Sequence, residues 1–199
     1  MSDSKDTSAP DTKQRIVTAG TELFRRRGYT GTGMKQIAEA ADAPFGSIYH
    51  FFPGGKAQLG EQVIRTSGAV YLGLVTAHLA PNENRAAATG DFFTAAAATL
   101  SDLDFADPCP IATVALEVAG TNERLRLATS EVFDSWIDGL ADYYAAGGIP
   151  QPVARETASS VIALLEGAFM LGRAARSTAP VLAAGRAATA IVRAVLADE

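Results

Sequence analysis

Apolar residues recur along this chain every three or four positions, which is the spacing of one face of an α-helix. The first clear example is the set Ile16, Ala19, Leu23 and Phe24. No segment alternates apolar and polar residues over several positions, as a half-buried strand would. The pattern therefore predicts an all-α protein.

Prolines and capping residues divide this pattern into helices, because proline is excluded from helix interiors. Asp11 is the expected N-cap of the first helix and Gly28 its stop, while Thr32 is the expected cap of the second helix. Residues 103–110 are expected to form a loop. The expected helices span residues 12–28, 34–41, 45–52, 56–79, 84–102, 111–119, 122–146, 152–176 and 181–197.

Two short helices joined by a tight turn, 34–41 and 45–52, have the dimensions of a helix-turn-helix. On the second helix, Ile48 and Phe52 share one face and are expected to pack on Ile37 and Phe24. The opposite face carries Phe45, Gly46, Tyr49 and His50, with Ser47 beside them. A face of small and hydrogen-bonding side chains suits the floor of a DNA groove.

Composition narrows the class of protein. The 199 residues include one cysteine, Cys109, and two histidines, His50 and His78, so neither an internal disulfide nor a Cys/His zinc cluster is expected. The polar residues 1–11 show no signal peptide and are expected to form a disordered arm. No apolar stretch of membrane-span length is recognised, so a cytoplasmic location without membrane contact is expected.

Charge is divided unevenly along the chain. Residues 11–59 carry seven Lys and Arg against four Asp and Glu, a net charge of +3, whereas residues 60–199 carry nine Arg against 16 acids, a net charge of −7. This division predicts a polyanion as partner of the N-terminal segment alone.

The chain lacks residues that the common enzyme motifs require. The pair Gly55-Lys56 has His50 where a phosphate-binding loop needs glycine, and Ala57 where it needs Ser or Thr. No serine-nucleophile elbow is present, and Cys109 follows an acidic stretch that would raise the pKa of its thiol. We therefore expect no catalysis, no cofactor and no metal.

The run from Gly28 to Ala41, continued by Gly46 to Phe52, resembles the DNA-binding domain of TetR-family regulators. The run Pro53 to Leu59, together with Cys109-Pro110-Ile111, resembles the LmrA/YxaF-type branch of that family. The resemblance implies a homodimeric repressor of about nine helices, with a DNA-binding domain at 12–57 and a ligand-binding and dimerisation domain at 58–199. It also implies phosphate contacts by Thr32, Tyr49 and Lys56, and base contacts by Lys35, Phe45, Gly46, Ser47 and His50. Phe45 departs from the basic or polar residue that many relatives carry.

The remaining helices are expected to pair protomers and to hold an effector. The dimer-interface candidates form apolar and small-residue stripes on the last two helices, for which packing within one protomer is the alternative: Ala158, Val161, Leu165, Phe169, Gly172, Ala187, Ile191, Ala194 and Val195. The pocket candidates are mostly aromatic or lie in apolar runs: Phe93, Phe105, Cys109, Leu116, Glu117, Phe133, Trp136, Glu166, Phe169 and Met170. An unpartnered carboxylate in such a run would be costly, so Glu117 and Glu166 each need a partner, either a ligand or a group of the protein.

The hypothesis from the sequence is a DNA-binding transcriptional regulator, a repressor that a small lipophilic or aromatic effector releases from double-stranded operator DNA. The alternative is a ligand-binding or interaction module whose helix-turn-helix no longer engages DNA.

Overall fold

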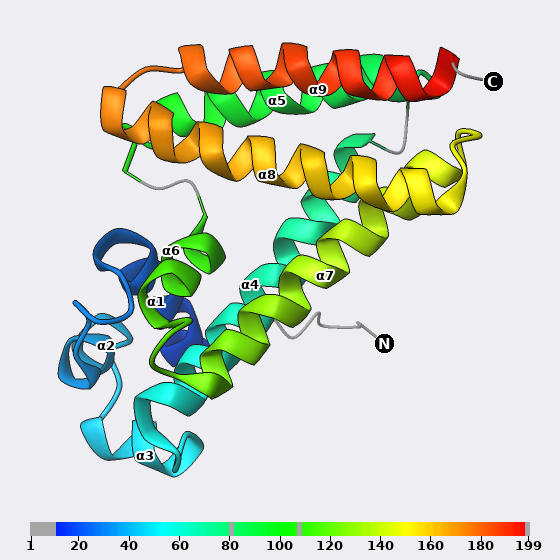
Figure 1. Ribbon diagram of the computed structural model, residues 1–199. Helices are drawn as coiled ribbons and strands as arrows, with labels where there is room; N and C mark the ends of the chain where they lie inside the picture. Colours follow the sequence, from blue (N-terminus) through cyan, green and yellow to red (C-terminus); the bar gives the residue numbers. More distant parts are fainter. Residues whose placement is uncertain (1–10, 80–81, 107–108, 198–199) are drawn as a thin grey trace, which may run out of the picture.

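The computed structural model describes residues 11–79, 82–106 and 109–197, and within those ranges it is all-helical with nine helices (Figure 1). The predicted N-terminal arm, apart from Asp11, lies outside the described residues. The helices are α1 (Thr12–Arg27), α2 (Met34–Ala40), α3 (Phe45–Phe51), α4 (Gly55–Leu79), α5 (Arg85–Asp102), α6 (Pro110–Val118), α7 (Glu123–Ala145), α8 (Gln151–Ala175) and α9 (Ala179–Ala197). Each lies within two residues of its predicted bounds, so the proline and glycine boundaries are confirmed.

Local capping explains most of these ends. The Asp11 carboxylate accepts a hydrogen bond from the Gln14 amide at 2.7 Å, and Gly28 ends α1 at φ +74°. The predicted cap of α2 is wrong by one residue. Gly33 occupies the N-cap, and its own amide donates to the Gln36 side chain at 2.9 Å.

The helices form a small head and a larger body (Figure 1). Helices α1, α2 and α3 make the head, and α4 and α7 run side by side from it toward a layer in which α5, α8 and α9 pack together. Because α4 is continuous from the end of the head into the body, the predicted boundary after residue 57 falls within one helix.

Two hydrophobic cores hold the molecule together, and the first extends beyond the head. It joins Phe24, Ile37 and Ile48 of the helix-turn-helix to Ile111 of α6 and Leu125 of α7, all fully buried. The second core fills the space between α5, α8, α9 and the end of α7. Helix α6 and the first half of α7 therefore pack as part of the head's core, which couples head and body mechanically.

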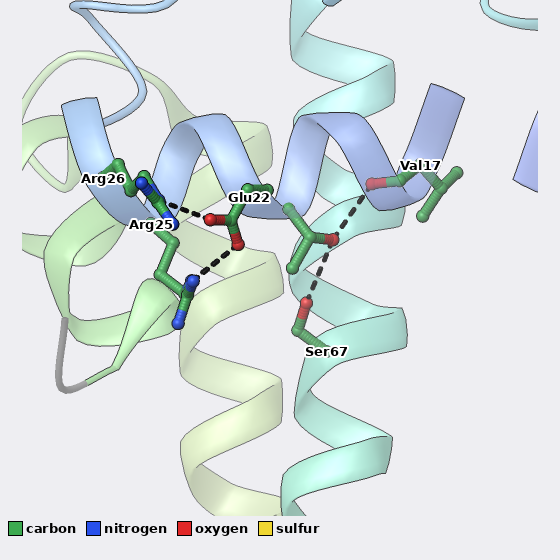
Figure 2. A network of polar contacts seen from close by, with 6 residues as sticks. Val17, Glu22, Arg25, Arg26 and Ser67 are labelled. Carbon is green, nitrogen blue, oxygen red and sulfur yellow. Dashed lines mark hydrogen bonds and ion pairs between the residues drawn. The ribbon is translucent and has the colours of Figure 1, made fainter. Parts of the chain in front are cut away.

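Polar side chains of α1 contact one another on the helix surface and contact α4 on its inner side. Figure 2 shows Glu22 between Arg25 and Arg26, and Arg25 Nη2 lies 2.6 Å from the Glu22 carboxylate. The Thr21 hydroxyl donates to Val17 O at 3.0 Å and lies 3.5 Å from the Ser67 hydroxyl of α4. The end of α1 is thus less positive than its three arginines suggest.

Two helices, α8 and α9, are long and apolar enough to cross a membrane by length and composition, contrary to the expectation that no stretch reaches that length. Core helices of soluble proteins have the same length and composition. Arg186 and Arg193 are exposed on α9, and arginine is costly in hydrocarbon.

Candidate DNA-binding face and internal cavity

Helix α3 presents one face to solvent and one to the core, as its sequence pattern predicts. Ile48 is fully buried, whereas Phe45 and Tyr49 are 49% and 47% exposed and their rings lie edge to face at 5.5 Å. Gly46 is also exposed, and a Cβ built on it would meet nothing within 4 Å. The outer face of α3 is therefore open to a bulky partner.

The remaining members of this face are less uniform. His50 is exposed and its ring contacts Phe51 at 5.0 Å, whereas Ser47 is half-buried. Lys35, on α2, is exposed and lies 4.0 Å from Glu39. Lys35 thus brings a weakly paired positive charge close to the start of the helix-turn-helix.

The α2–α3 turn is held by α1. The Arg15 guanidinium donates to Ala41 O and to Asp42 O, both at 3.1 Å, which satisfies carbonyls at the end of α2. Asp42 adopts φ +46°, a conformation that Asp tolerates better than most residues. These contacts fix the angle between α2 and α3, and with it the direction of the exposed face.

Thr32 does not fit its predicted role of phosphate contact through the side chain. It is 1% exposed, and its hydroxyl donates to Gly28 O at 2.8 Å. The side chain is a structural clamp on the α1–α2 turn. Sequence pattern could not separate this clamp from a phosphate ligand, because both need a hydroxyl at the start of α2.

Lys56 lies at the start of α4, with its Nζ 4.3 Å from the centre of the Tyr29 ring. Partial burial lowers the pKa of Lys56, and the negative charge of Glu117 acts in the opposite direction. The ammonium therefore stacks on the head itself and is half-buried.

Glu117 is bound by backbone groups of the head. Its carboxylate, on α6, accepts hydrogen bonds from the amides of Tyr29 at 3.2 Å and Thr30 at 2.7 Å, in the turn after α1. A Cβ at Gly28 would lie 1.9 Å from Glu117 Oε1, so this approach requires glycine there. Of the alternatives that the sequence left open, the partner within the protein is correct for Glu117.

A cavity of about 340 Å³ lies in the body, between α4, α5, α7 and α8. Of the predicted pocket residues, Cys109, Trp136, Glu166 and Phe169 line it. Phe92 of α5, one of the aromatic residues that the sequence offered for such a pocket, also lines it. Tyr71 and His78 of α4 line it as well and were missed. Their spacing along α4 is a helical stripe that could have been recognised, but the stripe alone does not distinguish a cavity wall from a packed core.

The other predicted pocket residues lie elsewhere. Leu116 and Met170 are 81% and 59% exposed, on outer faces of α6 and α8. Phe93 is fully buried on the α5–α9 side, where its Cβ would be 2.6 Å from a Cβ at Gly185. Phe133 packs on Trp136 at 5.6 Å, and Phe105 lies under the Arg176 guanidinium at 5.7 Å. Neither ring lines the cavity.

Cys109 both lines the cavity and begins α6. It is the N-cap of that helix, its sulfur accepts from the Ala112 amide at 3.4 Å, and it is 3% exposed. Burial raises the pKa of the Cys109 thiol well above its usual value, and the negative charge of Glu166 and a hydrogen bond to it act in the same direction. The thiol therefore keeps its proton at neutral pH.

The predicted dimer stripe on α8 is wrong. Ala158, Val161, Leu165 and Gly172 are buried within the protomer, facing the second core, so they cannot form a surface between protomers. Phe169 is half-buried and lines the cavity. The periodicity identified an apolar face correctly but not whether a neighbouring helix of the same chain covers it. Exposed small and apolar residues along the second half of α8 include Ala163, Met170, Leu171 and Ala174.

On α9 the predicted residues remain accessible. Ala187 and Ala194 are exposed, and Ile191 and Val195 are half-buried. Because α9 packs on α8, its exposed alanines and the outer residues of α8 belong to neighbouring helices.

Comparison with known proteins supports the same organisation. Residues 16–63 match the family described as bacterial regulatory proteins, tetR family, and residues 86–187 match the family described as transcriptional regulator LmrA/YxaF-like, C-terminal domain. The uncharacterised HTH-type regulator Rv0196 of Mycobacterium tuberculosis is 33% identical over 177 residues, 84% of this chain and 87% of its own length. The uncharacterised HTH-type regulator YxaF of Bacillus subtilis is 27% identical over 187 residues, 94% of this chain and 98% of its own length.

Solved structures show the same fold. The regulatory protein TetR from Rhodobacter sphaeroides superposes with a TM-score of 0.79 at 21% identity, over 89% of this chain and 97% of that one. The reduced form of NemR from Escherichia coli gives 0.76 at 22% identity, over 90% and 95% of the two chains. This chain belongs to the TetR family of DNA-binding, helix-turn-helix transcriptional regulators, in its LmrA/YxaF-like branch. Its relatives are transcriptional regulators rather than enzymes.

Proposed function

We propose that this protein is a homodimeric repressor that reads its operator with the outer face of α3 and leaves it when a small molecule fills the body cavity. Operator reading by α3 is supported by one observation. One side of this helix is buried, and the other side exposes Phe45, Gly46, Tyr49 and His50. In a helix-turn-helix the second helix enters the major groove, and such a face supplies close approach and hydrogen-bonding groups. Operator binding implies a cytoplasmic location.

Protomers would pair through the exposed residues of α8 and α9, in place of the buried stripe. Ala163, Met170 and Leu171 of α8 and Ala187 and Ala194 of α9 are exposed. Small residues permit close approach of helices, and the exposed apolar side chains gain from burial. A two-fold dimer places its two α3 helices on one side, to meet half-sites about one helical turn or a multiple of it apart.

The response to a ligand would pass through α6. One end of this helix, Cys109, lines the cavity, and Glu117 near its other end holds the turn between α1 and α2. A ligand that displaces Cys109 therefore acts on a short rigid element tied to the head. The bound state would favour a separation of the two heads that no longer matches successive major grooves.

The test is a gel shift of the full chain on DNA from upstream of its own gene. We expect a sequence-specific complex. Lys56→Ala should weaken binding to all sequences alike and reduce the slope of log affinity against log salt by about one, as loss of one phosphate contact does. Ser47→Ala or His50→Ala should instead change the ranking of operator variants.

Three outcomes count against the proposal. A sequence-selective loss in Lys56→Ala would show that Lys56 is not a phosphate contact. Unchanged ranking in both α3 variants would exclude direct readout by this helix. Failure to bind any duplex would favour an interaction module that no longer engages DNA.

A further inference from the structure

Exposed aromatic rings are confined to the outer face of α3. All Phe, Tyr and Trp residues of the chain lie in the ranges that the structure describes, and only Phe45 and Tyr49 among them are exposed, at 49% and 47%. The other rings are buried or half-buried. Removing apolar surface from water is favourable, so the open side of the Phe45 ring gains from an apolar partner.

Tyr49 holds the Phe45 ring in place at the helix surface. The two residues are one turn apart on α3, and their rings meet edge to face, with centroids 5.5 Å apart and planes at 73°. Gly46, beside Phe45, has no side chain, and a Cβ built on it would meet nothing within 4 Å. The backbone of the first turn and the Phe45 ring can therefore approach a flat surface together.

Helix α3 carries no cation with which to read guanine. None of its seven residues is Lys or Arg, the side chains that bind the O6 and N7 atoms of guanine. The N-terminal residues of the second helix of a helix-turn-helix are the ones that contact base edges, and Phe45 is the first residue of α3. The position closest to the bases thus offers an apolar ring and no hydrogen-bonding group.

The floor of the major groove offers such a ring one apolar group, the 5-methyl group of thymine. Phenylalanine is one of the side chains that contact this methyl group in protein–DNA complexes. Cytosine presents an amino group in the groove instead, and that donor would lose water beside the Phe45 ring without gaining an acceptor.

We propose that Phe45, supported by Tyr49, reads the 5-methyl group of one thymine in each half-site of the operator. The inference rests on the proposed function in taking the outer face of α3 as the surface that meets DNA. It adds the base, and the group on that base, that the first residue of α3 recognises.

Replacing thymine by deoxyuridine tests the contact, because it removes the methyl group and leaves the hydrogen-bonding groups of the base unchanged. The full-length protein first selects its preferred duplex from a pool with a random stretch of about 30 base pairs, which leaves room for two half-sites. Each thymine of that duplex is then replaced in turn, and affinity is measured by fluorescence anisotropy at one salt concentration. We expect one thymine in each half-site at which replacement weakens binding about three- to fivefold, and a loss of about tenfold or more when both are replaced.

Variants of the aromatic pair assign the effect, with the duplex replaced in both half-sites as the probe. Phe45→Ala should bind the thymine and deoxyuridine duplexes to within about twofold of each other, whereas Phe45→Leu, which keeps an apolar side chain, should retain a preference of about threefold or more. Tyr49→Phe keeps the supporting ring and should keep the full preference. Val153→Ala, at a 37% exposed position near the start of α8, is the control and should change neither affinity nor preference.

Each preference is a ratio of two affinities of one protein, so it does not depend on how much of a variant is folded. The inference is overturned if no thymine of the selected duplex is sensitive to replacement, or if the sensitivity survives in Phe45→Ala. Either result, obtained with a sequence-specific complex, leaves the proposed operator binding intact. If the protein selects no duplex at all, the proposed function is contradicted together with this inference.

Discussion

At the scale of single residues, the α1–α2 turn requires glycine at position 28 for two reasons, its backbone conformation and the close approach of a carboxylate. Gly28 has φ +74°, and its missing Cβ lets Glu117 Oε1 approach. Thr32 then closes the turn by donating to the Gly28 carbonyl. The turn sets where α2 begins and so helps to place the helix-turn-helix.

Gly28→Ala is expected to lower the free energy of unfolding by about 2–4 kcal/mol, because alanine is strained at positive φ and its methyl group displaces the Glu117 carboxylate. Urea unfolding followed by circular dichroism measures the change. Gly73→Ala, in α4, is the control: a Cβ there meets nothing within 4 Å, so alanine should leave stability equal or up to about 1 kcal/mol higher. Equal effects at both positions would contradict the contact with Glu117.

Tyr144 gives the body a sensitivity to alkaline pH. Its hydroxyl lies 2.9 Å from that of Thr89, and burial raises its pKa to about 12. The unfolded chain ionises this tyrosine near pH 10, so its stabilising effect is complete below that pH and is lost as the pH rises toward 12. Wild type should therefore lose about 2 kcal/mol more than Tyr144→Phe between these limits. Urea unfolding at several alkaline pH values checks this, and parallel curves for the two proteins would contradict it.

At the scale of elements, α6 is the link between cavity and head. Its nine residues begin at the cavity with Cys109 as cap and bring Glu117 to the amides of Tyr29 and Thr30. The first core packs α6 against α1 and α7, so in the proposed response to a ligand the helix would move as a unit. The Glu117 carboxylate would then pass that movement to the head.

Glu117→Gln should keep the fold and weaken this link, because a neutral amide oxygen is a poorer acceptor than a carboxylate and its NH₂ group cannot accept from the second amide. We expect the change in operator affinity caused by an effector that fills the cavity to shrink by about fivefold, while binding of that effector itself stays within twofold in the absence of DNA. Anisotropy of labelled operator measures the first quantity and Trp136 fluorescence the second. Glu123→Gln, an exposed residue paired with Arg126 on α7, should change neither. An unaltered operator response in Glu117→Gln would exclude this route.

At the scale of the whole molecule, the outer faces of α8 and α9 remain without a partner in one chain. Both helices have the length and apolar composition of membrane spans, yet α9 exposes Arg186 and Arg193. A second copy of the chain would cover alanines and larger apolar side chains with matching surface. It would also supply the second head that a palindromic operator needs.

The double variant Met170→Glu, Leu171→Glu should convert the dimer into a monomer, since it places like charges on both sides of a two-fold interface. Sedimentation velocity measures the mass in solution, and operator affinity should fall with it by at least about tenfold. Leu116→Glu tests a still more exposed leucine, on α6, and should leave the dimer intact. A monomeric wild type, or a dimer that survives the double variant, would contradict this interface.

The sequence by itself determined the helices and the outer face of α3. Prolines, glycines and the 3.6-residue period of apolar positions determine structure through residues that are close together in the sequence. Asp11, Gly28 and the pair Ile48 and Phe52 were therefore interpreted correctly. The positions of Thr32 and Glu117 in the sequence did not reveal their partners.

Only the tertiary structure decided which apolar faces are covered. The stripe of α8 through Val161 and Leu165 is periodic in either case, and it is buried because α5, α7 and α9 pack around it. The cavity has the same origin, since its rings come from helices far apart along the chain and only their packing leaves the space between them. Periodicity reports what one helix presents, whereas burial depends on which other helix meets that face.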